Sequence, residues 1–369
     1  MIQRKVMYMT DRISVAVLFG GVSSEHEISC ISAASVLNHI DRDRYDISTI
    51  GITKEGNWFL TGSPVANIGD GSWEKDDSNR RAFIAPDRSV GGIMAETGDG
   101  RFEILKVDVV LPMLHGRNGE DGTIQGLFQI AGIPFVGSGT AASAASMDKV
   151  MTKAIINQSG VVAQAGCCVS YRNVYESDRP AETERIREFF KNIFPLFVKP
   201  ANAGSSVGIT KVKEEEDLPA ALELAFGEDD KVLVEEAIKG REIEVAVLGN
   251  ESPQASCIGE IFAANEFYDY NAKYENSMSR TAIVRDLPPE KEEEIRSKAV
   301  KVYETMGCAG MARIDFFLEE SGRVVLNELN TLPGFTSISM YPKLWEESGL
   351  PYDKLIDELI TLALEKGDR

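Results

Sequence analysis

Apolar residues recur along the chain as short unbroken runs that alternate with longer stretches of helical spacing, and this pattern predicts an α/β protein. The run 13–19 (ISVAVLF) stops at a pair of glycines, and continuous β-branched runs are typical of parallel strands covered on both faces. A helix follows it, then strands at 46–52 and 107–111 and a second helix at 123–130. The alternation predicts an N-terminal α/β domain, 1–138, with an open parallel sheet.

Three local patterns add detail to this domain. Ser24 and Glu27 have the S-x-x-E spacing of a capping box, which predicts that the first helix starts there. The acidic, glycine-rich stretch 69–100 is typical of an insertion or a surface hairpin rather than of core. Residues 1–11 are mixed and charged, and we expect them to be a disordered leader or a tag outside the fold.

Two smaller units of mixed α and β structure are expected in the rest of the chain. The first, 139–235, is predicted to begin with one helix from Ser143 to Gly160 and to continue with a strand at 196–199 and a Gly-Ser loop. The second, 236–369, ends in a helix with an apolar stripe. Its other expected elements are strands at 243–248 and 255–261, a helix at 290–306 and two further strands.

The composition is that of an ordinary globular protein with an acidic excess. Of the 369 residues 43% are hydrophobic, and 39 basic residues stand against 58 acidic ones, which gives a net charge of −19. Such a surface repels phosphate backbones, so we exclude nucleic acid as a partner. A few lysines in a cleft can still hold a small phosphate ligand.

Two further counts bear on the location of the protein. No run of about 18 apolar residues exists, which excludes a membrane-spanning helix. The five cysteines are odd in number and form no Cys-x-x-Cys motif, as expected of reduced thiols in a cytoplasmic protein. Three histidines offer little for a zinc site.

The strongest chemical signal is a predicted hairpin of two strands, RIDFFL and VVLNELN, joined by the turn EESGR. Period-two alternation places Arg313 and Asp315 on one face, and Glu328 and Asn330 on one face of the partner strand. If Asp315 pairs with Glu328, like charges oppose each other and need something positive between them. The oxygen ligands suit Mg²⁺ that holds substrate phosphates. The alternative is a solvated face with a salt bridge to Arg313.

Two other segments fit a nucleotide. Lys199 ends a strand just before the turn 203–208, whose backbone N–H groups can wrap phosphate oxygens. Taken alone, such a turn is more often a ligand-free hairpin, but Lys149 and Lys199 in an acidic protein favour phosphate. The strand that ends at Glu235 and Glu236 offers backbone groups for an adenine edge.

Taken together, these segments resemble the D-alanine–D-alanine ligase family of the ATP-grasp superfamily over nearly the whole chain. The order Lys149, Lys199-Pro, Gly-Ser-Ser-Val-Gly, Arg-Ile-Asp and Asn-Glu-Leu-Asn is similar to that of ATP-grasp enzymes. Four longer motifs match the family itself: FGGVSSEHEIS at 19–29, HGRNGEDG at 115–122, YDYNAKY at 268–274 and NTLPGFTSIS at 330–339. The resemblance implies a three-domain ATP-grasp architecture with the nucleotide between the second and third domains.

The resemblance also implies an activity, the ATP-dependent ligation of two D-alanine molecules for peptidoglycan precursor synthesis. ATP phosphorylates the carboxylate of the first D-alanine, and the amine of the second attacks this acylphosphate, which gives the dipeptide, ADP and phosphate. Phosphorylation turns a poor leaving group into a good one, so catalysis is expected to depend on positioning and charge neutralisation. Family members are commonly dimers, and we expect a homodimer.

By the same resemblance, the nucleotide and metal belong to the second and third domains. Lys149 and Lys199 would hold the α- and β-phosphates and Lys273 the γ-phosphate, with Ser205 and Ser206 in a closing loop. The remaining nucleotide contacts would be Glu235, Glu236, Ala237 and Ile238 at adenine, Glu242 at the ribose, and Asn327 and Glu328. Two Mg²⁺ ions, or Mn²⁺ in their place, would be carried by Asp315, Glu328 and Asn330.

The first D-alanine would be held by residues of the N-terminal domain and of a mobile loop. Glu27 would bind its ammonium group, with His115 beside it. Tyr274, Ser205 and Glu27 resemble the hydrogen-bonded set that closes the loop over the site in this family.

The reacting groups and the second substrate would lie against the third domain. Arg313 and the backbone N–H of Gly334 would stabilise the oxyanion that forms when the amine attacks. Ser339 and the backbone of Met340 would receive the carboxylate of the second substrate. The apolar side chain of Met340 offers no partner for a serine hydroxyl, which favours D-alanine. A D-alanine–D-serine ligase of the vancomycin-resistance type is the alternative.

Two other classes of protein fit less well. A regulator that binds nucleotide but has lost catalysis would not need the complete set of Lys273, Arg313, Asp315, Glu328 and Asn330. A dinucleotide-binding oxidoreductase is suggested only by the glycine pair after the first strand. The sequence there is GGVSSE and not G-x-G-x-x-G.

Overall fold

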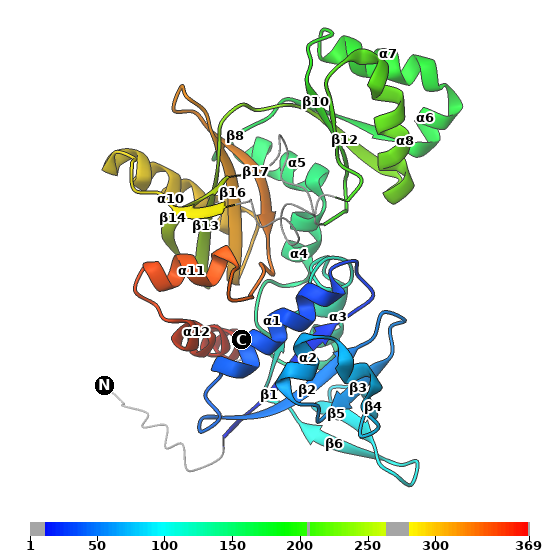
Figure 1. Cartoon of the computed structure of the whole chain (residues 1–369), viewed down its shortest axis with the longest axis vertical. Coiled ribbons are helices and arrows are strands. Elements are labelled where there is room, and N and C mark those ends of the chain that lie inside the picture. The colour runs from blue at the N-terminus through cyan, green and yellow to red at the C-terminus, as the bar shows by residue number, and fades with distance from the viewer. Residues whose placement is uncertain (1–11, 205–206, 263–279, 368–369) are drawn as a thin grey trace.

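The computed structural model of the protein describes residues 12–204, 207–262 and 280–367. Within these ranges the chain forms three sheets, of seven, four and six strands. Figure 1 shows the seven-stranded sheet at one end of an elongated molecule, the six-stranded sheet in the middle and the four-stranded sheet at the other end. The fold thus combines α/β and α+β parts, as the sequence predicts. The leader or tag expected at 1–11 lies outside the described residues.

The N-terminal sheet is mixed rather than parallel throughout. β1 (Ile13–Gly20) pairs in parallel with β2 (Tyr45–Ile52) and with β7 (Val109–Pro112), so the predicted parallel arrangement holds for these three strands. Antiparallel strands extend the sheet beyond β2. They are, in order, β3 (Trp58–Thr61), β4 (Arg80–Ile84), β5 (Gly92–Glu96) and β6 (Phe102–Lys106).

The stretch 69–100, predicted to be an insertion or a surface hairpin rather than core, contains a hairpin of two antiparallel strands that is built into this sheet. It supplies β4, β5 and the short 3-10 helix η1 (Ser72–Lys75), which follows helix α2 (Val65–Gly69). Trp73 of η1 is completely buried, and its ring takes the space beside Gly51, where an added Cβ would lie 2.3 Å from it. The predicted hairpin is confirmed, but the expectation that the stretch lies outside the core was wrong. Charge and glycine dominate its composition, while its few apolar residues pack inside.

Helix α1 (His26–His39) begins without the predicted capping box. Its N-cap is Glu25, and no side chain accepts a hydrogen bond from the first helical turn. The Ser23 hydroxyl accepts a hydrogen bond from the Glu25 N–H at 3.1 Å instead. The Glu27 side chain points outward to Lys54, with which it forms an exposed ion pair.

The four-stranded sheet is antiparallel throughout. Its order is β11 (Thr210–Val212), β10 (Leu196–Pro200), β12 (Lys231–Glu236) and β9 (Cys167–Tyr171). Helices lie on its outer side in Figure 1. They are α6 (Arg172–Ser177), α7 (Arg179–Phe189) and α8 (Leu218–Glu228), the last preceded by the 3-10 turn η2 (Glu215–Asp217).

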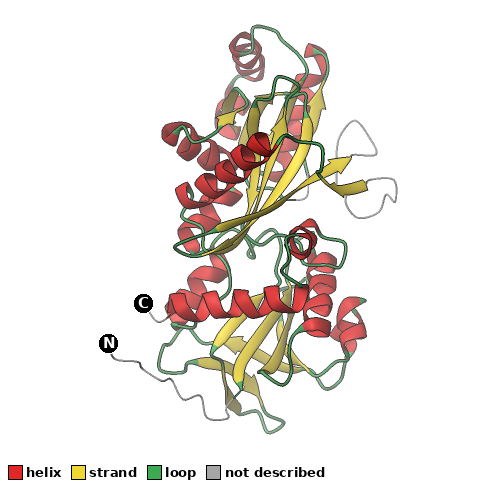
Figure 2. Cartoon of the chain, turned by 90° about the vertical axis from the view of Figure 1, so that its left-hand side faces the viewer, coloured by secondary structure: helices red, strands yellow, loops and turns green. Residues whose placement is uncertain are grey.

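The six-stranded sheet forms the middle of the molecule and is covered by helices (Figure 2). Its strands, in order, are β15 (Arg280–Ile283), β14 (Gln254–Phe262), β13 (Arg241–Gly249), β16 (Gly310–Leu318), β17 (Val324–Asn330) and β8 (Ala163–Gln164). Its pairs are antiparallel except for β17 with β8. The long helix α10 (Pro289–Thr305) and the shorter α11 (Met340–Glu347) pack against β13 and β14.

The predicted helix from Ser143 to Gly160 is two helices. α4 (Thr140–Met147) ends before Asp148, and α5 (Lys149–Ser159) begins after it. One oxygen of Asp148 accepts hydrogen bonds from the N–H groups of Val150 and Met151, at 2.9 and 3.0 Å, which caps α5. Both helices pack on the six-stranded sheet or its helix α10. Residues 140–164, which the sequence analysis assigns to the central unit, therefore belong structurally with the third sheet.

The chain enters and leaves the four-stranded sheet at one place. Gly166 precedes β9, and Glu236 is the last residue of β12. The Glu236 N–H donates to the Gly166 carbonyl at 2.9 Å, and the Gly166 N–H donates to the Glu236 carboxylate at 2.9 Å. The two chain crossings are thus hydrogen-bonded to each other.

The N-terminal and third sheets share one hydrophobic core. Helix α12 (Tyr352–Gly367) packs against α1 and β7 on one side and against β13 and β16 on the other. Its Leu355 and Leu359 are buried together with Val15 of β1 and Phe335 of the third domain. Since this core is continuous, packing fixes the N-terminal domain against the third domain.

Two further observations, on membrane-spanning helices and on cysteines, complete the description. No helix in the described parts of the chain has the length and apolar composition needed to cross a membrane. All five cysteines lie in the described ranges and are free thiols.

The cap at Asp148 generates a stability prediction. Asp148→Ala removes two hydrogen bonds to the first turn of α5 and an ion pair with Lys231, so we expect the free energy of unfolding to fall by about 1–2 kcal/mol. Urea unfolding followed by circular dichroism measures this. The exposed Asp43→Ala serves as the matched control and should stay within about 0.5 kcal/mol of the unsubstituted protein. Equal stabilities for the two variants would contradict the assigned cap.

Candidate active site

The acidic hairpin has the register that the sequence analysis gives as a condition, and a β-bulge between Asp315 and Phe316 produces it. β16 and β17 pair Arg313 with Asn330 and Asp315 with Glu328. The Arg313 guanidinium donates two hydrogen bonds to Asp315, at 2.8 and 2.7 Å, and lies 3.1 Å from Glu244 of β13. The Asn330 amide donates to Asp315 at 3.1 Å. The Arg313 guanidinium thus lies between the carboxylates of Asp315 and Glu244.

Burial strengthens the electrostatic interactions within this charge cluster. Asp315 and Glu244 are 3% and 2% exposed, so neither carboxylate is well solvated. Burial alone would lower the pKa of Arg313, but the carboxylates of Asp315 and Glu244 raise it well above its usual value. The guanidinium is therefore charged, and it points along the hairpin face that carries the predicted metal ligands.

The predicted metal ligands fit a hard divalent cation. Asp315, Glu328 and Asn330 supply carboxylate and amide oxygens from adjacent positions of one hairpin, and this is the donor set that Mg²⁺ and Mn²⁺ prefer. Within the described ranges no group of three His, Cys, Asp or Glu side chains converges as a metal cluster. A cation at this site would therefore need Asn330 and other oxygen ligands beside the two carboxylates.

A cavity of about 1110 Å³ lies between the four-stranded and six-stranded sheets. Its lining brings together segments that are far apart in the sequence: β10, the end of β12, β13, β14 and the hairpin. Most of the predicted nucleotide residues line it, namely Lys199, Glu235, Glu236, Ala237, Ile238, Glu242, Asn327 and Glu328. One end of the cavity thus reaches the acidic hairpin at Glu328.

An ion-pair network fixes Lys199 at the wall of this cavity. The Glu235 carboxylate lies 2.9 Å from the Lys153 ammonium and also pairs with Lys199. Burial would raise the pKa of Glu235, but Lys199 and Lys153 lower it to about 2. Glu235 is therefore ionised and positions Lys199. Lys149, at the start of α5, donates from its ammonium to the Ala203 carbonyl at 2.7 Å, which ties it to the glycine- and serine-rich turn.

Four predicted residues lie outside the described ranges. They are Ser205 and Ser206 of the glycine-rich turn and Lys273 and Tyr274 of the YDYNAKY motif. The neighbouring Gly204 is described, and a Cβ added there would lie 2.7 Å from the Glu25 carboxylate. Gly204 therefore lies directly beside Glu25 of the N-terminal domain.

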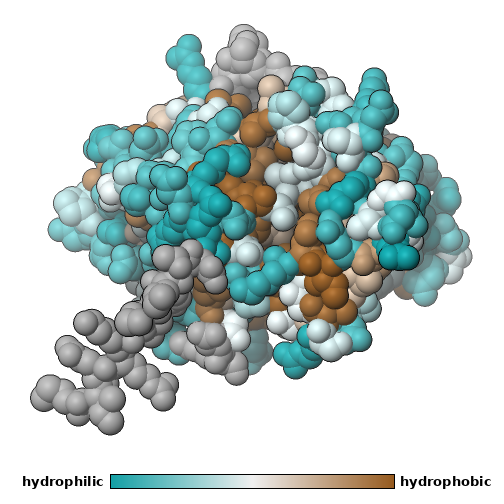
Figure 3. All heavy atoms as spheres, turned by 90° about the horizontal axis from the view of Figure 1, so that it is seen from below, coloured by the Kyte–Doolittle hydropathy of each residue, from teal (hydrophilic) through white to brown (hydrophobic). Residues whose placement is uncertain are grey.

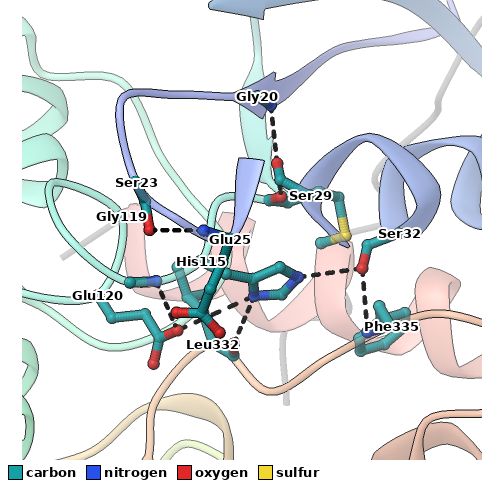
Figure 4. Close-up of polar contacts among 12 residues, drawn as sticks. Gly20, Ser23, Glu25, Ser29, Ser32, His115, Gly119, Glu120, Leu332 and Phe335 are labelled. Atoms are coloured by element: carbon teal, nitrogen blue, oxygen red, sulfur yellow. Dashed lines mark hydrogen bonds and ion pairs between the residues drawn. The ribbon is translucent and has the colours of Figure 1, made fainter. Parts of the chain in front are cut away.

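Glu25, and not the predicted Glu27, faces the site. Glu25 is 8% exposed, and Figure 4 shows its carboxylate pointing toward His115 and Glu120. The Glu27 side chain is 57% exposed and pairs with Lys54. Since a helix turns by about 100° per residue, two residues apart at its start face nearly opposite ways. The sequence offered a signal for Glu25, because it precedes the predicted helix on the loop after β1.

Glu120 and His115 form a buried polar group with Glu25. Glu120 accepts a hydrogen bond from the Gly116 N–H at 3.0 Å and lies 3.9 Å from His115 Nδ1. Burial, then the Glu25 carboxylate, raise the pKa of Glu120 to about 8. Burial also lowers the pKa of His115, against the attraction of Glu25. His115 is therefore neutral near pH 7.

Three of the predicted substrate residues lie at the passage from β17 to α11: Gly334 and Ser339 on the loop, and Met340 as the first residue of α11. Ser339 is the N-cap of α11, and its hydroxyl accepts a hydrogen bond from the Thr336 N–H at 3.0 Å. Met340 is 5% exposed, and a Cβ added to Gly259 would lie 1.9 Å from its terminal methyl group. Its side chain is thus in the core, so the sequence argument from an apolar side chain facing the substrate is wrong. The N–H of Met340, in the first turn of α11, faces the loop.

Sequence reasoning missed four residues that the fold brings to the site. They are Glu25, Glu120, Lys153 and Glu244. Glu120 lies within the quoted motif HGRNGEDG and Lys153 one helical turn after Lys149, so the motif and the helical spacing contain a signal for both. Glu244 comes to Arg313 only through pairing of β13 with β16, and local sequence does not predict that contact.

Comparisons with known proteins indicate the same family for both parts of the chain. Residues 14–138 match the model of the D-ala D-ala ligase N-terminus, and residues 161–361 match that of the D-ala D-ala ligase C-terminus. A D-alanine–D-alanine ligase of Acetivibrio thermocellus is 48% identical over 97% of each chain. D-alanine–D-alanine ligase B of Clostridium tetani is 49% identical over 96% of this chain and 94% of its own.

Solved structures give the same result. The VanG D-Ala:D-Ser ligase of Enterococcus faecalis superposes with a TM-score of 0.85 at 38% identity, over 96% of this chain and all of its own (100%). The D-alanine–D-alanine ligase of Coxiella burnetii superposes with a TM-score of 0.84 at 35% identity, over 97% and 96%. Matches of this extent and identity establish common descent, and the protein belongs to the D-alanine–D-alanine ligase family.

Proposed function

We propose that this protein is an ATP-dependent ligase that joins two D-alanine molecules to D-alanyl-D-alanine through a D-alanyl phosphate intermediate, and so supplies a peptidoglycan precursor. The observation that carries the proposal is the cavity between the second and third sheets. It is lined by the predicted nucleotide residues and ends at the acidic hairpin, where phosphoryl transfer requires charge neutralisation.

ATP would lie along this cavity. Glu242 lies where it can meet the ribose hydroxyls, and Lys199 and Lys149 hold the α- and β-phosphates. The N–H groups of Glu236 and Ala237 already donate to the Gly166 and Pro195 carbonyls, so we assign adenine recognition chiefly to the backbone of Ile238. Glu235 acts through Lys199, whose ammonium it orients. Lys273, with Ser205 and Ser206, completes the phosphate contacts in this proposal.

Two Mg²⁺ ions, or Mn²⁺, complete the phosphate site. Asp315, Glu328 and Asn330 would hold them. When bound, the ions neutralise charge on the phosphates that react. Arg313 keeps the carboxylates together and offers its guanidinium to the same region. It also stabilises the oxyanion that forms when the amine attacks the acylphosphate, together with the Gly334 N–H.

The first D-alanine would be bound at the N-terminal domain by Glu25, in place of Glu27. A buried carboxylate beside neutral His115 suits an ammonium group, because the pair replaces the solvent that the ammonium loses. Tyr274 and Ser205 would close the loop over Glu25, and the approach of Gly204 to Glu25 supports this.

The second D-alanine would bind at the start of α11. The Ser339 hydroxyl and the Met340 N–H offer hydrogen bonds to its carboxylate, and the N-terminal end of a helix favours an anion. The family resemblance also supports a homodimer, and five free thiols support a cytoplasmic location. Exposed apolar side chains on β4 and β6 (Phe83, Phe102 and Ile104) offer one surface for a partner subunit, and Figure 3 shows apolar side chains at this end of the molecule.

A D-alanine–D-serine ligase is the second candidate, because the VanG D-Ala:D-Ser ligase superposes closely on this chain. Purified protein supplied with ATP and Mg²⁺ distinguishes the two. We expect dipeptide and ADP from D-alanine alone, with D-serine and D-lactate used less well as the second substrate and L-alanine not used. Product analysis by mass spectrometry gives the preference. Preferred incorporation of D-serine would overturn the D-alanine assignment.

The proposal that Glu25, and not Glu27, binds the substrate ammonium gives a paired prediction. Glu25→Gln keeps the shape of the side chain but removes the charge that binds the substrate ammonium, so kcat/KM for D-alanine should fall by about 10- to 100-fold. Glu27→Gln, which changes an exposed carboxylate, is the matched control and should stay within about twofold. The opposite ranking in steady-state kinetics would restore Glu27 as the ligand.

The pKa of Glu120 gives a prediction on stability. Its usual value is 4.5 and its value in the folded protein is about 8, so the unfolded chain loses this proton first. Below about pH 4.5 the raised pKa of Glu120 therefore does not change the free energy of unfolding. Between about pH 4.5 and pH 8 it lowers the free energy of unfolding increasingly, and above about pH 8 the loss is constant. Glu120→Gln should accordingly raise the melting temperature relative to the unsubstituted protein increasingly from pH 5 to pH 8. A difference that does not change with pH would contradict the raised pKa.

A further inference from the structure

The turn 332–335 (LPGF), which carries Gly334, is held at three of its backbone groups by side chains. His115 Nδ1 lies 3.1 Å from the Leu332 carbonyl oxygen. The Phe335 N–H donates to the Ser32 hydroxyl at 3.4 Å, and the Phe335 carbonyl accepts from the Tyr352 hydroxyl at 2.6 Å. Both ends of the turn are thus fixed, with Gly334 between them.

The three side chains come from different parts of the chain. Ser32 lies on α1, His115 follows β7, and Tyr352 begins α12. Ser32 is completely buried, and the ring of Phe335 packs 5.5 Å from that of Tyr352 and 5.7 Å from that of Tyr341. A turn of the third domain is therefore aligned by the N-terminal domain, and not by its own sheet alone.

Donor and acceptor chemistry fixes the direction of the hydrogen bonds. A carbonyl oxygen only accepts, so His115 Nδ1 carries the proton, and Nε2 of the neutral ring is an acceptor. The Ser32 hydroxyl, 3.0 Å from Nε2, then donates to it. The lone pairs of the Ser32 oxygen remain to accept from the Phe335 N–H. Figure 4 shows this chain from Phe335 through Ser32 to His115 and Leu332.

We propose that Ser32 is a positioning residue of the ligase reaction, which together with His115 and Tyr352 sets the direction of the Gly334 N–H toward the reacting carboxyl group. The inference rests on the proposed role of Gly334 in stabilising the oxyanion. Ser32 is completely buried, so its role is not direct contact with substrate. It acts through Phe335, the residue whose N–H follows that of Gly334 in the chain.

A purely structural role for Ser32 makes a different prediction. A hydroxyl that only satisfies a buried N–H would stabilise the fold, and its loss would lower the melting temperature with little effect on turnover of the folded enzyme. A positioning role lowers kcat in particular, because an oxyanion donor acts in the transition state and a misplacement of about 1 Å can cost about 100-fold.

The experiment compares Ser32→Ala with two other variants of the full-length enzyme. Tyr352→Phe removes the other hydrogen bond to Phe335 and keeps the ring. Ser256→Ala is the matched control, because Ser256 is a buried serine that also accepts from a backbone N–H, that of Ala246 at 3.0 Å, away from the turn. The measurements are kcat with D-alanine, KM for ATP and the melting temperature.

We expect kcat to fall by about 10- to 100-fold in Ser32→Ala and by a smaller factor in Tyr352→Phe, with KM for ATP within about twofold. Ser256→Ala should keep its kcat within about twofold at a similar loss of melting temperature. A kcat within twofold in both folded turn variants would overturn the inference, and so would a parallel loss of kcat in Ser256→Ala. If Ser32→Ala does not fold, the kcat of Tyr352→Phe alone tests the inference.

Hydrogen exchange supplies a readout that does not depend on turnover. Peptides covering 332–335 should exchange faster in Ser32→Ala than in the unsubstituted protein and in Ser256→Ala, and unchanged exchange would refute the positioning. An unsubstituted protein that does not ligate D-alanine would refute the proposed function instead. The two failures are therefore distinguishable.

Discussion

A buried guanidinium organises the chemistry of this protein. Asp315, Glu328 and Glu244 bring three carboxylates onto neighbouring strands, and such a group repels itself in a low-dielectric interior. Arg313 lies among them with bidentate hydrogen bonds to Asp315 and a second contact to Glu244. Removing one partner of a buried charge group costs about 3–5 kcal/mol. Arg313 therefore stabilises the acidic hairpin in this sheet, and the cavity reaches the same hairpin at Glu328.

The second constraint is the core that the N-terminal and third domains share. Because α12 packs on both, the loop after β1, the loop after β7 and the turn before α11 meet at fixed distances. The groups proposed for the two amino acids come from these three loops. Their geometry is thus set by packing rather than by any one local motif, which explains why residues as far apart as Ser32 and Phe335 share a hydrogen bond.

The sequence predicts those parts of the site that depend on short-range periodicity. Alternation on a strand places Arg313 and Asp315 on one face, but their pairing with Asn330 and Glu328 depends on a β-bulge between Asp315 and Phe316, which alternation does not predict. Which of Glu25 and Glu27 faces the site could not be predicted, because it depends on where α1 begins. The predicted capping box of Ser24 and Glu27 is absent, and the N-cap is Glu25. The burial of Trp73 beside Gly51 and the contact of Glu244 with Arg313 depend on strand pairing between distant segments, which no local pattern encodes.

The crossing at Gly166 and Glu236 has a mechanical consequence. All covalent connection between the four-stranded sheet and the rest of the molecule passes through this one hydrogen-bonded pair. A rotation about it changes the width of the cavity while every β ladder stays intact. Ion pairs also tie the two sides together, such as Lys153 with Glu235 and Lys231 with Asp148. These pairs are largely buried, so breaking them is costly. The crossing therefore marks the covalent axis for any rotation of the four-stranded sheet, and the buried ion pairs oppose that rotation.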